Sequence, residues 1–229
     1  MTKKILVLVC SFTAGSYECE VEGLNQPSWI APDKCTNLKG WWYFVDYFKD
    51  KDVTIIPTPA QGYWSYYQIL LFLNEKNKLH YNEIWIQETL EPRSILLNKK
   101  NIDHIMLLSV ENIDNFIYMQ ISHGDQLLLD PWNAKKENLP YTLWSNSFFN
   151  DIVKMCTEKI DLLCEERNIK GYVWSMYEPI MDCNHFTRLP LKNVRQELYN
   201  NNLLTGEHTG CHQTEEGNKY IAKNINTVS

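Results

Sequence analysis

Apolar and polar positions follow one another along the chain in blocks that predict strands and helices in turn. The first block, residues 5–10, is a continuous apolar run, which is typical of a parallel strand buried on both faces. The short run 53–56 predicts a second strand, which two following prolines bring to an end. Two further strands are predicted at 83–87 (EIWIQ) and 170–175 (KGYVWS).

Between these strands the apolar positions recur with a helical period. Helices are predicted at 38–48, 62–73, 147–167, 191–199 and 215–225. In the long amphipathic segment 147–167, one face carries Phe148, Ile152, Met155, Ile160, Leu163 and Cys164. Residues 12–37 contain turn residues without a clear period, so we expect a long loop there.

Strand and helix alternate over most of the chain, which predicts an α/β fold: a parallel sheet with helices on both faces and right-handed crossovers. Residues 91–143 interrupt this alternation with short β-like runs, and we expect them to form an insertion near the ends of the main sheet. No repeat or linker divides the chain, so residues 1–229 are expected to form one domain that contains the insertion.

Composition and charge narrow the classes of function. The net charge of -6 gives no basic field for phosphates, so no nucleic-acid partner is expected. The N-terminal apolar run is too short for a signal peptide, and no stretch is long enough to span a bilayer, so we expect a cytoplasmic protein without membrane contact. The seven cysteines are odd in number and lack a CxxC pair, which favours reduced thiols.

One serine and one histidine stand where an α/β fold places its reactive groups. Ser11 comes directly after the first predicted strand, where free N–H groups can bind an oxyanion, although a serine there also serves as a helix N-cap. His212 lies on a loop before the last predicted helix, from which it can reach the strand ends. The pair is the minimum for nucleophilic acyl transfer. The plainer interpretation of His212 is a polar loop residue before a helix capped by Thr214.

Both ends of the chain resemble a known family. The segment ILVLVCSFTAG resembles the first block of the SGNH (GDSL-like) hydrolases, and CHQTEEGNKYIAKNI resembles their last block, in the same order. The resemblance implies a flavodoxin-like three-layer α/β/α sandwich of about five strands. It also implies hydrolysis of an ester, such as an O-acetyl ester of a carbohydrate, without metal or other cofactor. Ser11 would be the nucleophile and His212 its base.

The middle blocks of the family are less distinct here. The resemblance places Gly62 as the second oxyanion donor; the alternative is that Gly62 only serves the turn into a helix. Thr89 aligns by count with the third donor, with Gln87 and Arg93 as alternatives. A threonine followed by proline and arginine is similar to phage-encoded members, which suggests a phage or viral protein.

Aromatic side chains stand next to the expected oxyanion glycine. Tyr63 and Trp64 follow it directly, and they either line an acyl or sugar pocket or belong to the core. No metal site is expected, because the cysteines and histidines lack the paired spacing of zinc ligands. The expected partner is therefore a small-molecule or carbohydrate ester.

The acid that normally supports the histidine is missing. Thr209 occupies the family's aspartate position, and loss of that acid lowers the rate by about 10⁴-fold. Glu207, Asp182 or a Ser–His dyad supported by a backbone carbonyl are the three candidates to replace it. The leading hypothesis is a serine esterase, and an acyltransferase is a variant of it. The alternative is an inactive module of the same fold that binds a glycan or a protein.

Overall fold

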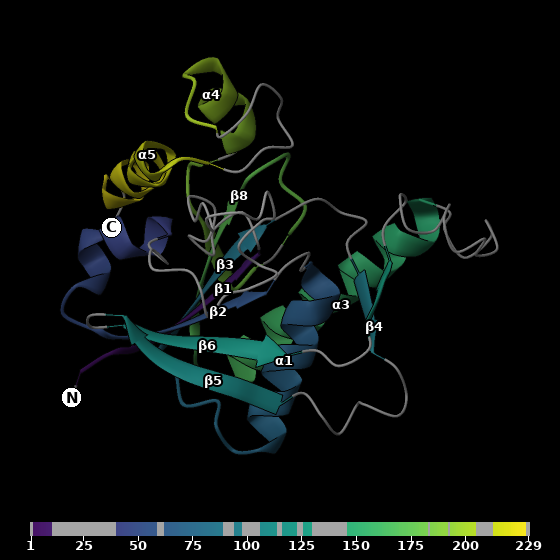
Figure 1. Cartoon of the computed structure of the whole chain (residues 1–229). Helices are drawn as coiled ribbons and strands as arrows, with labels where there is room; N and C mark the ends of the chain where they lie inside the picture. Colours follow the sequence, from purple (N-terminus) through teal and green to yellow (C-terminus); the bar gives the residue numbers. More distant parts are fainter. Residues whose placement is uncertain are drawn as a thin grey trace, which may run out of the picture.

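The chain folds into a three-layer α/β/α sandwich in the computed structural model (Figure 1). The structure describes residues 2–10, 40–58, 62–88, 94–97, 106–113, 116–122, 126–129, 146–182, 184–191, 193–204 and 213–227. The predicted loop 12–37 lies outside these residues. None of the helices in the described ranges is long and apolar enough to cross a bilayer.

The central sheet has seven strands in the order β5-β6-β2-β1-β3-β8-β9. Their bounds are β1 (Lys4–Cys10), β2 (Asp52–Thr58), β3 (Glu83–Glu88), β5 (Met106–Ile113), β6 (Phe116–Ser122), β8 (Lys170–Ser175) and β9 (Phe186–Arg188). The run β2-β1-β3-β8-β9 is parallel throughout. This is the strand order of flavodoxin-like sheets, and it confirms the predicted fold class.

Four strands come from the predicted insertion. β5 and β6 form an antiparallel hairpin, and β6 pairs in parallel with β2, so the hairpin widens the sheet sideways. β4 (Ser94–Leu97) and β7 (Gln126–Leu129) pair separately as a two-stranded antiparallel sheet. The insertion was expected near the strand ends; instead, part of it covers the open hydrogen-bonding groups of β2, which would otherwise be an exposed edge.

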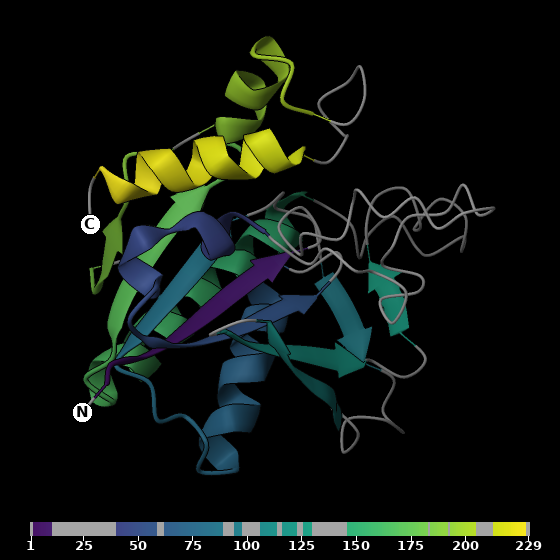
Figure 2. The same ribbon diagram turned by 60° about the vertical axis from the view of Figure 1, so that its left-hand side comes forward.

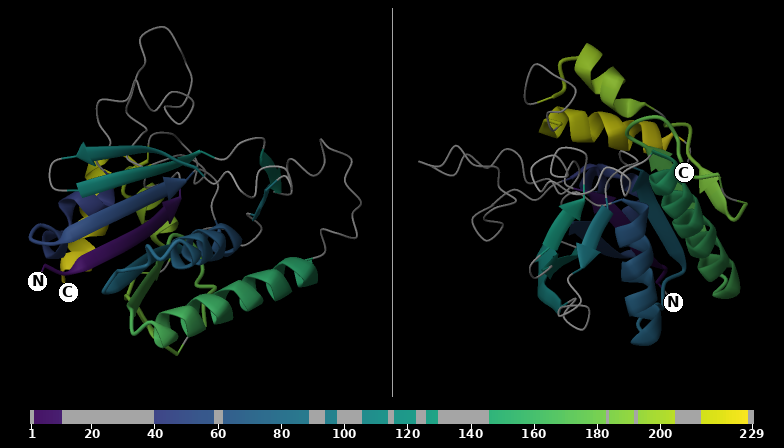
Figure 3. Two further views of the ribbon diagram at one scale, coloured as in Figure 1. Left: turned by 90° about the horizontal axis from the view of Figure 1, so that it is seen from below. Right: turned by 90° about the vertical axis from the view of Figure 1, so that its right-hand side faces the viewer.

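Helices cover both faces of the sheet (Figures 2 and 3). The helices α1 (Tyr63–Glu75) and α3 (Asn146–Glu166) lie on one face; η4 (Trp41–Phe44), η5 (Asp46–Phe48), α4 (Val194–Asn200) and α5 (Glu215–Asn226) lie on the other. Successive β1 side chains point to opposite faces: Leu6 and Leu8 pack against α1 and α3, whereas Val7 packs against the other layer. All are fully buried, as the apolar run predicted.

The prediction of one helix at 38–48 is wrong. The described part of this segment forms two short 3₁₀ helices, η4 and η5, which Val45 separates in an extended conformation. The buried positions Trp41, Trp42, Val45 and Phe48 fit the spacing of an α-helix, but the extended backbone of Val45 divides the segment into two turns. The remaining predicted helices correspond to α1, α3, α4 and α5.

Candidate site at the carboxyl end of the sheet

The parallel strands end together, and we call this side the carboxyl end of the sheet. Cys10 at the end of β1 pairs with Thr58 at the end of β2, and Glu88 at the end of β3 pairs with Ser175 at the end of β8. Parallel α/β folds carry their ligand sites beyond such strand ends. Ser11 directly follows Cys10 in the sequence but lies outside the described residues.

The helix α5 begins toward this same side of the molecule. Figure 2 shows its N-terminal end on the side at which the β1 arrow ends, and its C-terminal end on the opposite side. Thr214 caps α5 as predicted: its Oγ1 accepts a hydrogen bond from the N–H of Gly217 at 3.1 Å. His212 and Glu207 precede this cap in the sequence and lie outside the described residues.

Gly62 is the N-cap residue of α1, directly after the segment that follows β2. It is buried and extended, with φ -136° and ψ -170°, a conformation open to any residue. Among the described residues, no side chain caps the first turn of α1. The first N–H groups of a helix have no partner within the helix, so this turn has donors at the carboxyl end of the sheet. The role of Gly62 as an oxyanion donor remains a prediction.

Polar groups from several elements converge on Glu88, which is 1% exposed and lies at this end of the sheet. Arg188 on β9 donates to both carboxylate oxygens, from Nη1 to Oε2 at 2.6 Å and from Nη2 to Oε1 at 3.2 Å. The Ser175 hydroxyl also donates to Oε2. A buried carboxylate is costly without a compensating charge, so the bidentate Arg188 allows Glu88 to remain at the base of the site.

Three further donors complete the shell of Glu88. The Tyr63 hydroxyl donates to Oε1 at 2.5 Å, and the backbone N–H groups of Met181 and Ile180 donate to the same oxygen at 2.5 and 3.2 Å. Burial and then the Glu88 charge raise the pKa of Tyr63 well above 10. The hydroxyl therefore stays protonated and keeps donating. The Tyr63 ring is buried and its hydroxyl is bonded to Glu88; the predicted role of Tyr63 in lining a pocket remains a prediction.

Neither Glu88 nor Arg188 was found from the sequence. The only local signal is a charged residue at the end of the apolar run EIWIQ, and such a residue ordinarily faces solvent. The partner of Glu88 lies on β9, a strand of three residues that is too short to give a period of its own. A contact between two such distant positions leaves no trace in a local pattern.

Two other predicted site residues lie within the described part of the chain. Gln87 is fully buried, and strand alternation places its side chain on the face of Trp85, opposite to Glu88 and under the layer that contains α5. Trp64 is half-buried against the α1 and α3 layer, and its enclosed indole N–H has no acceptor among the described residues. Thr89 and Arg93 lie outside the described residues.

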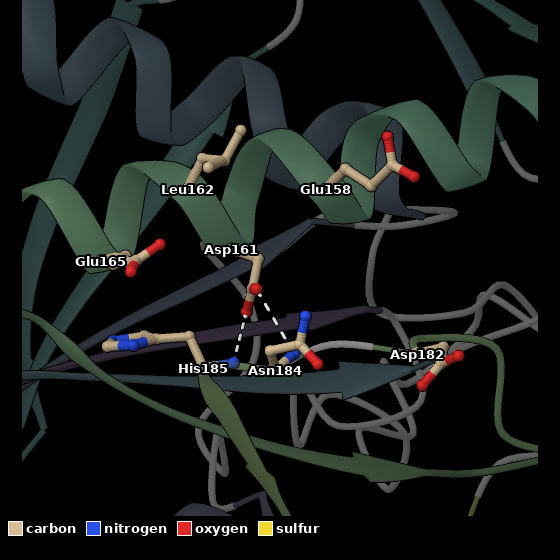
Figure 4. A pocket seen from close by; sticks show the side chains of 7 residues that line it. All are labelled: Glu158, Asp161, Leu162, Glu165, Asp182, Asn184 and His185. Atoms are coloured by element: carbon tan, nitrogen blue, oxygen red, sulfur yellow. Dashed lines mark hydrogen bonds between the residues drawn. The ribbon is translucent and has the colours of Figure 1, made fainter.

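A separate pocket of about 500 Å³ lies between α3 and the connection from β8 to β9 (Figure 4). Its lining residues are Glu158, Asp161, Leu162, Glu165, Asp182, Asn184 and His185. The Asp161 carboxylate accepts from the backbone N–H groups of His185 at 3.0 Å and Asn184 at 3.3 Å. His185 Nε2 donates to the carbonyl of Ile169 at 2.6 Å. These bonds fasten the connection to α3.

Asp182, one candidate for the missing acid, is among the residues that line this pocket. Asp182 is exposed and lines the pocket beside α3, whereas α5, which follows His212 in the sequence, covers the opposite face of the sheet. Asp182 is therefore on the α3 side of the molecule. The position of His212 lies outside the described residues, so Glu207, Asp182 and a dyad without an acid all remain predictions.

No protein-family model matches the chain, and no curated protein matches it either.

Within the described residues, no three histidine, cysteine, aspartate or glutamate side chains form a group that could hold a metal ion. Cys156 is buried on α3, and burial raises the pKa of its thiol to about 11, so this thiol is inert at neutral pH. With no relative to compare, the function has to be argued from the residues at the carboxyl end of the sheet.

Proposed function

We propose that the protein is a serine esterase of the SGNH type, with Ser11 as nucleophile and His212 as general base. The observation that carries this proposal is the place at which the two resembling segments join the fold. β1 ends at the carboxyl end of the sheet and leads directly into Ser11; α5 begins toward the same side, and His212 precedes its cap (Figure 2). Segments from opposite ends of the chain thus lead toward the same side of the molecule.

The chemistry follows from these positions. The Ser11 hydroxyl attacks the ester carbonyl while His212 accepts its proton, and the N–H groups of Ser11 and Gly62, with a side chain near Thr89, hold the oxyanion. The alcohol leaves with the proton from His212, and an acyl ester on Ser11 remains. Water activated by His212 then releases the acid. The proposed substrates are small esters, including O-acetyl esters of carbohydrates.

The third role in the proposal belongs to Glu207. Glu207 lies two residues before Thr209, which stands at the usual position of the acid, and Asp182 is the alternative. A carboxylate beside the imidazole fixes its tautomer and stabilises the imidazolium. Thr209 at the usual acid position favours a second candidate function, an inactive module of the same fold that binds a glycan or a protein.

Covalent labelling with a fluorophosphonate probe tests the proposal. We expect stoichiometric labelling of the wild-type protein and a loss of about 10³-fold or more in rate for Ser11→Ala and His212→Ala, because neither retains an activated serine. Matched controls are Ser65→Ala, a buried serine on α1, and His80→Ala, an exposed histidine before β3. Both should label at the wild-type rate. A folded wild-type protein that does not label would contradict the esterase and favour the binding module.

A further inference from the structure

Two tyrosine hydroxyls fasten the first turn of α1 to the end of β3. The Tyr63 hydroxyl donates to Glu88 Oε1 at 2.5 Å, and the Tyr66 hydroxyl donates to the backbone carbonyl of Gln87 at 3.0 Å. Both rings are buried and meet edge to face, with centroids 6.1 Å apart. Residues three apart share one side of a helix, so both hydroxyls can bond to the end of β3 at once, one to Glu88 and the other to Gln87.

The end of β3 is a firm anchor for this turn. Glu88 is held by Arg188 from β9, by the Ser175 hydroxyl from β8 and by the N–H groups of Met181 and Ile180 in the connection between those strands. Its position is thus set from several elements at once. The Tyr63 hydroxyl bonds α1 to a carboxylate that several elements hold, so we expect removal of that hydroxyl to displace α1 rather than Glu88.

We propose that Tyr63 and Tyr66 are positioning residues that hold the N–H of Gly62, the proposed oxyanion donor, in place against the end of β3, an inference that rests on the proposed esterase function. Gly62 directly precedes Tyr63 in the sequence and is the N-cap residue of α1. The Tyr63–Glu88 hydrogen bond is therefore one residue from this donor. Oxyanion donors work only at fixed hydrogen-bond distances from the developing charge, so a small displacement of α1 lowers the rate.

The other end of β3 offers a matched control. Glu83, the first residue of β3, is also 1% exposed, and its Oε1 accepts from the Tyr47 hydroxyl at 2.7 Å. Tyr47→Phe and Tyr63→Phe therefore remove the same group from the same kind of partner on the same strand. Tyr47 lies on η5, at the amino end of the sheet and far from the proposed donors. The two variants thus compare the loss of a bond to a buried carboxylate at opposite ends of β3, although Tyr47 is only half-buried and its hydroxyl also accepts from Lys3 Nζ at 3.3 Å.

The test compares kcat and KM for p-nitrophenyl acetate, together with fluorophosphonate labelling rates and thermal unfolding. Tyr63→Phe should lower kcat and the labelling rate by about 10-fold with KM unchanged, because the transition state alone needs the donors in place. Tyr47→Phe should keep both rates within about twofold of wild type. Tyr66→Phe should lower kcat and the labelling rate in the same direction but by less. If Tyr63→Phe does not fold, Tyr66→Phe replaces it in the comparison.

The outcomes separate the two proposals. A wild type that labels at Ser11, with Tyr63→Phe and Tyr66→Phe as active as wild type, overturns the positioning role and leaves the esterase intact. Equal losses in Tyr63→Phe and Tyr47→Phe also overturn it, because they indicate general destabilisation. A folded wild type that neither labels nor turns over the ester overturns the esterase function, and the positioning role fails with it.

Discussion

Two buried glutamates define the two ends of β3, and each is compensated in its own way. Glu88 receives a bidentate arginine and four other donors, whereas Glu83 receives the exposed Lys3 ammonium at 2.9 Å, the Tyr47 hydroxyl and the Trp85 indole N–H. The Lys3 charge is partly in water and can be replaced by solvent. Glu88 is enclosed, and among the described residues the cation that pairs with it is Arg188.

Removal of the Arg188 side chain should therefore be costly. Arg188→Ala leaves the Glu88 carboxylate buried without its counter-charge, and we expect the free energy of unfolding to fall by about 3 kcal/mol. Urea unfolding monitored by circular dichroism measures this loss. The matched control is Lys219→Ala, which removes an exposed cation that pairs with Glu215 and Glu216 on α5. A loss no larger than that of the control would show that the Glu88 pair is not a stabilising element.

At the scale of elements, the start of α5 depends on one close backbone approach. Gly217 lies in the first turn, and a Cβ added there would sit 2.6 Å from the carbonyl oxygen of Leu203 and 2.9 Å from the Cβ of Gln213. The same carbonyl accepts from the Thr214 N–H at 2.9 Å. Glycine thus lets the first turn of α5 rest against the segment after α4, next to the residues that lead from His212.

Gly217→Ala should be destabilising although alanine favours a helix. Alanine gains about 1 kcal/mol of helix propensity over glycine, but a methyl group against a fixed backbone carbonyl costs more, and we expect a net loss of about 2 kcal/mol. Chemical unfolding of the variant measures it. The exposed Lys223 on the same helix supplies the control Lys223→Ala, which should change the stability little. A stabilised Gly217→Ala protein would contradict the tight seating of α5.

At the scale of the whole molecule, Glu83 joins β1, η5 and β3 at the amino end of the sheet. Burial raises the pKa of its carboxyl, but hydrogen bonds from Tyr47, Lys3 and Trp85 outweigh burial and hold the pKa below its ordinary value. A lowered pKa in the folded state means that the unfolded state binds the proton more tightly. The stabilisation is therefore fully present above the unfolded-state pKa of about 4.3 and is lost as the pH falls through the folded-state pKa.

The pH dependence of unfolding should report this linkage. Between about pH 5 and pH 3 the stability of wild type should fall more steeply than that of Glu83→Gln, which has no proton to gain. Tyr47→Phe should lie between the two, because it removes one of the bonds that lower the pKa. Thermal unfolding in a series of buffers provides the measurement. Parallel curves for wild type and Glu83→Gln would exclude Glu83 as a contributor to the acid transition.

Much of the fold can be predicted from the sequence because its main signal is local. A few neighbouring residues are enough to predict the apolar run of β1, the alternation of strands with amphipathic helices and the Thr214 cap. The prediction at 38–48 failed because the buried positions have the spacing of an α-helix, whereas the extended backbone at Val45 that divides the segment has no signal in that spacing. The nucleophile and base are proposed from local motifs in the same way.

What the sequence by itself determined is thus the α/β class and the main elements, and the dyad of Ser11 and His212 remains a prediction from it. Only the tertiary structure decided that the β5–β6 hairpin widens the sheet beside β2, that Asp182 lies on the α3 side and that Tyr63, Ser175 and Arg188 meet on Glu88. The physical reason is the separation along the chain between the residues that interact. Hydrophobic periodicity acts between near neighbours in the chain, whereas strand pairing and the compensation of a buried charge join segments that only packing brings together.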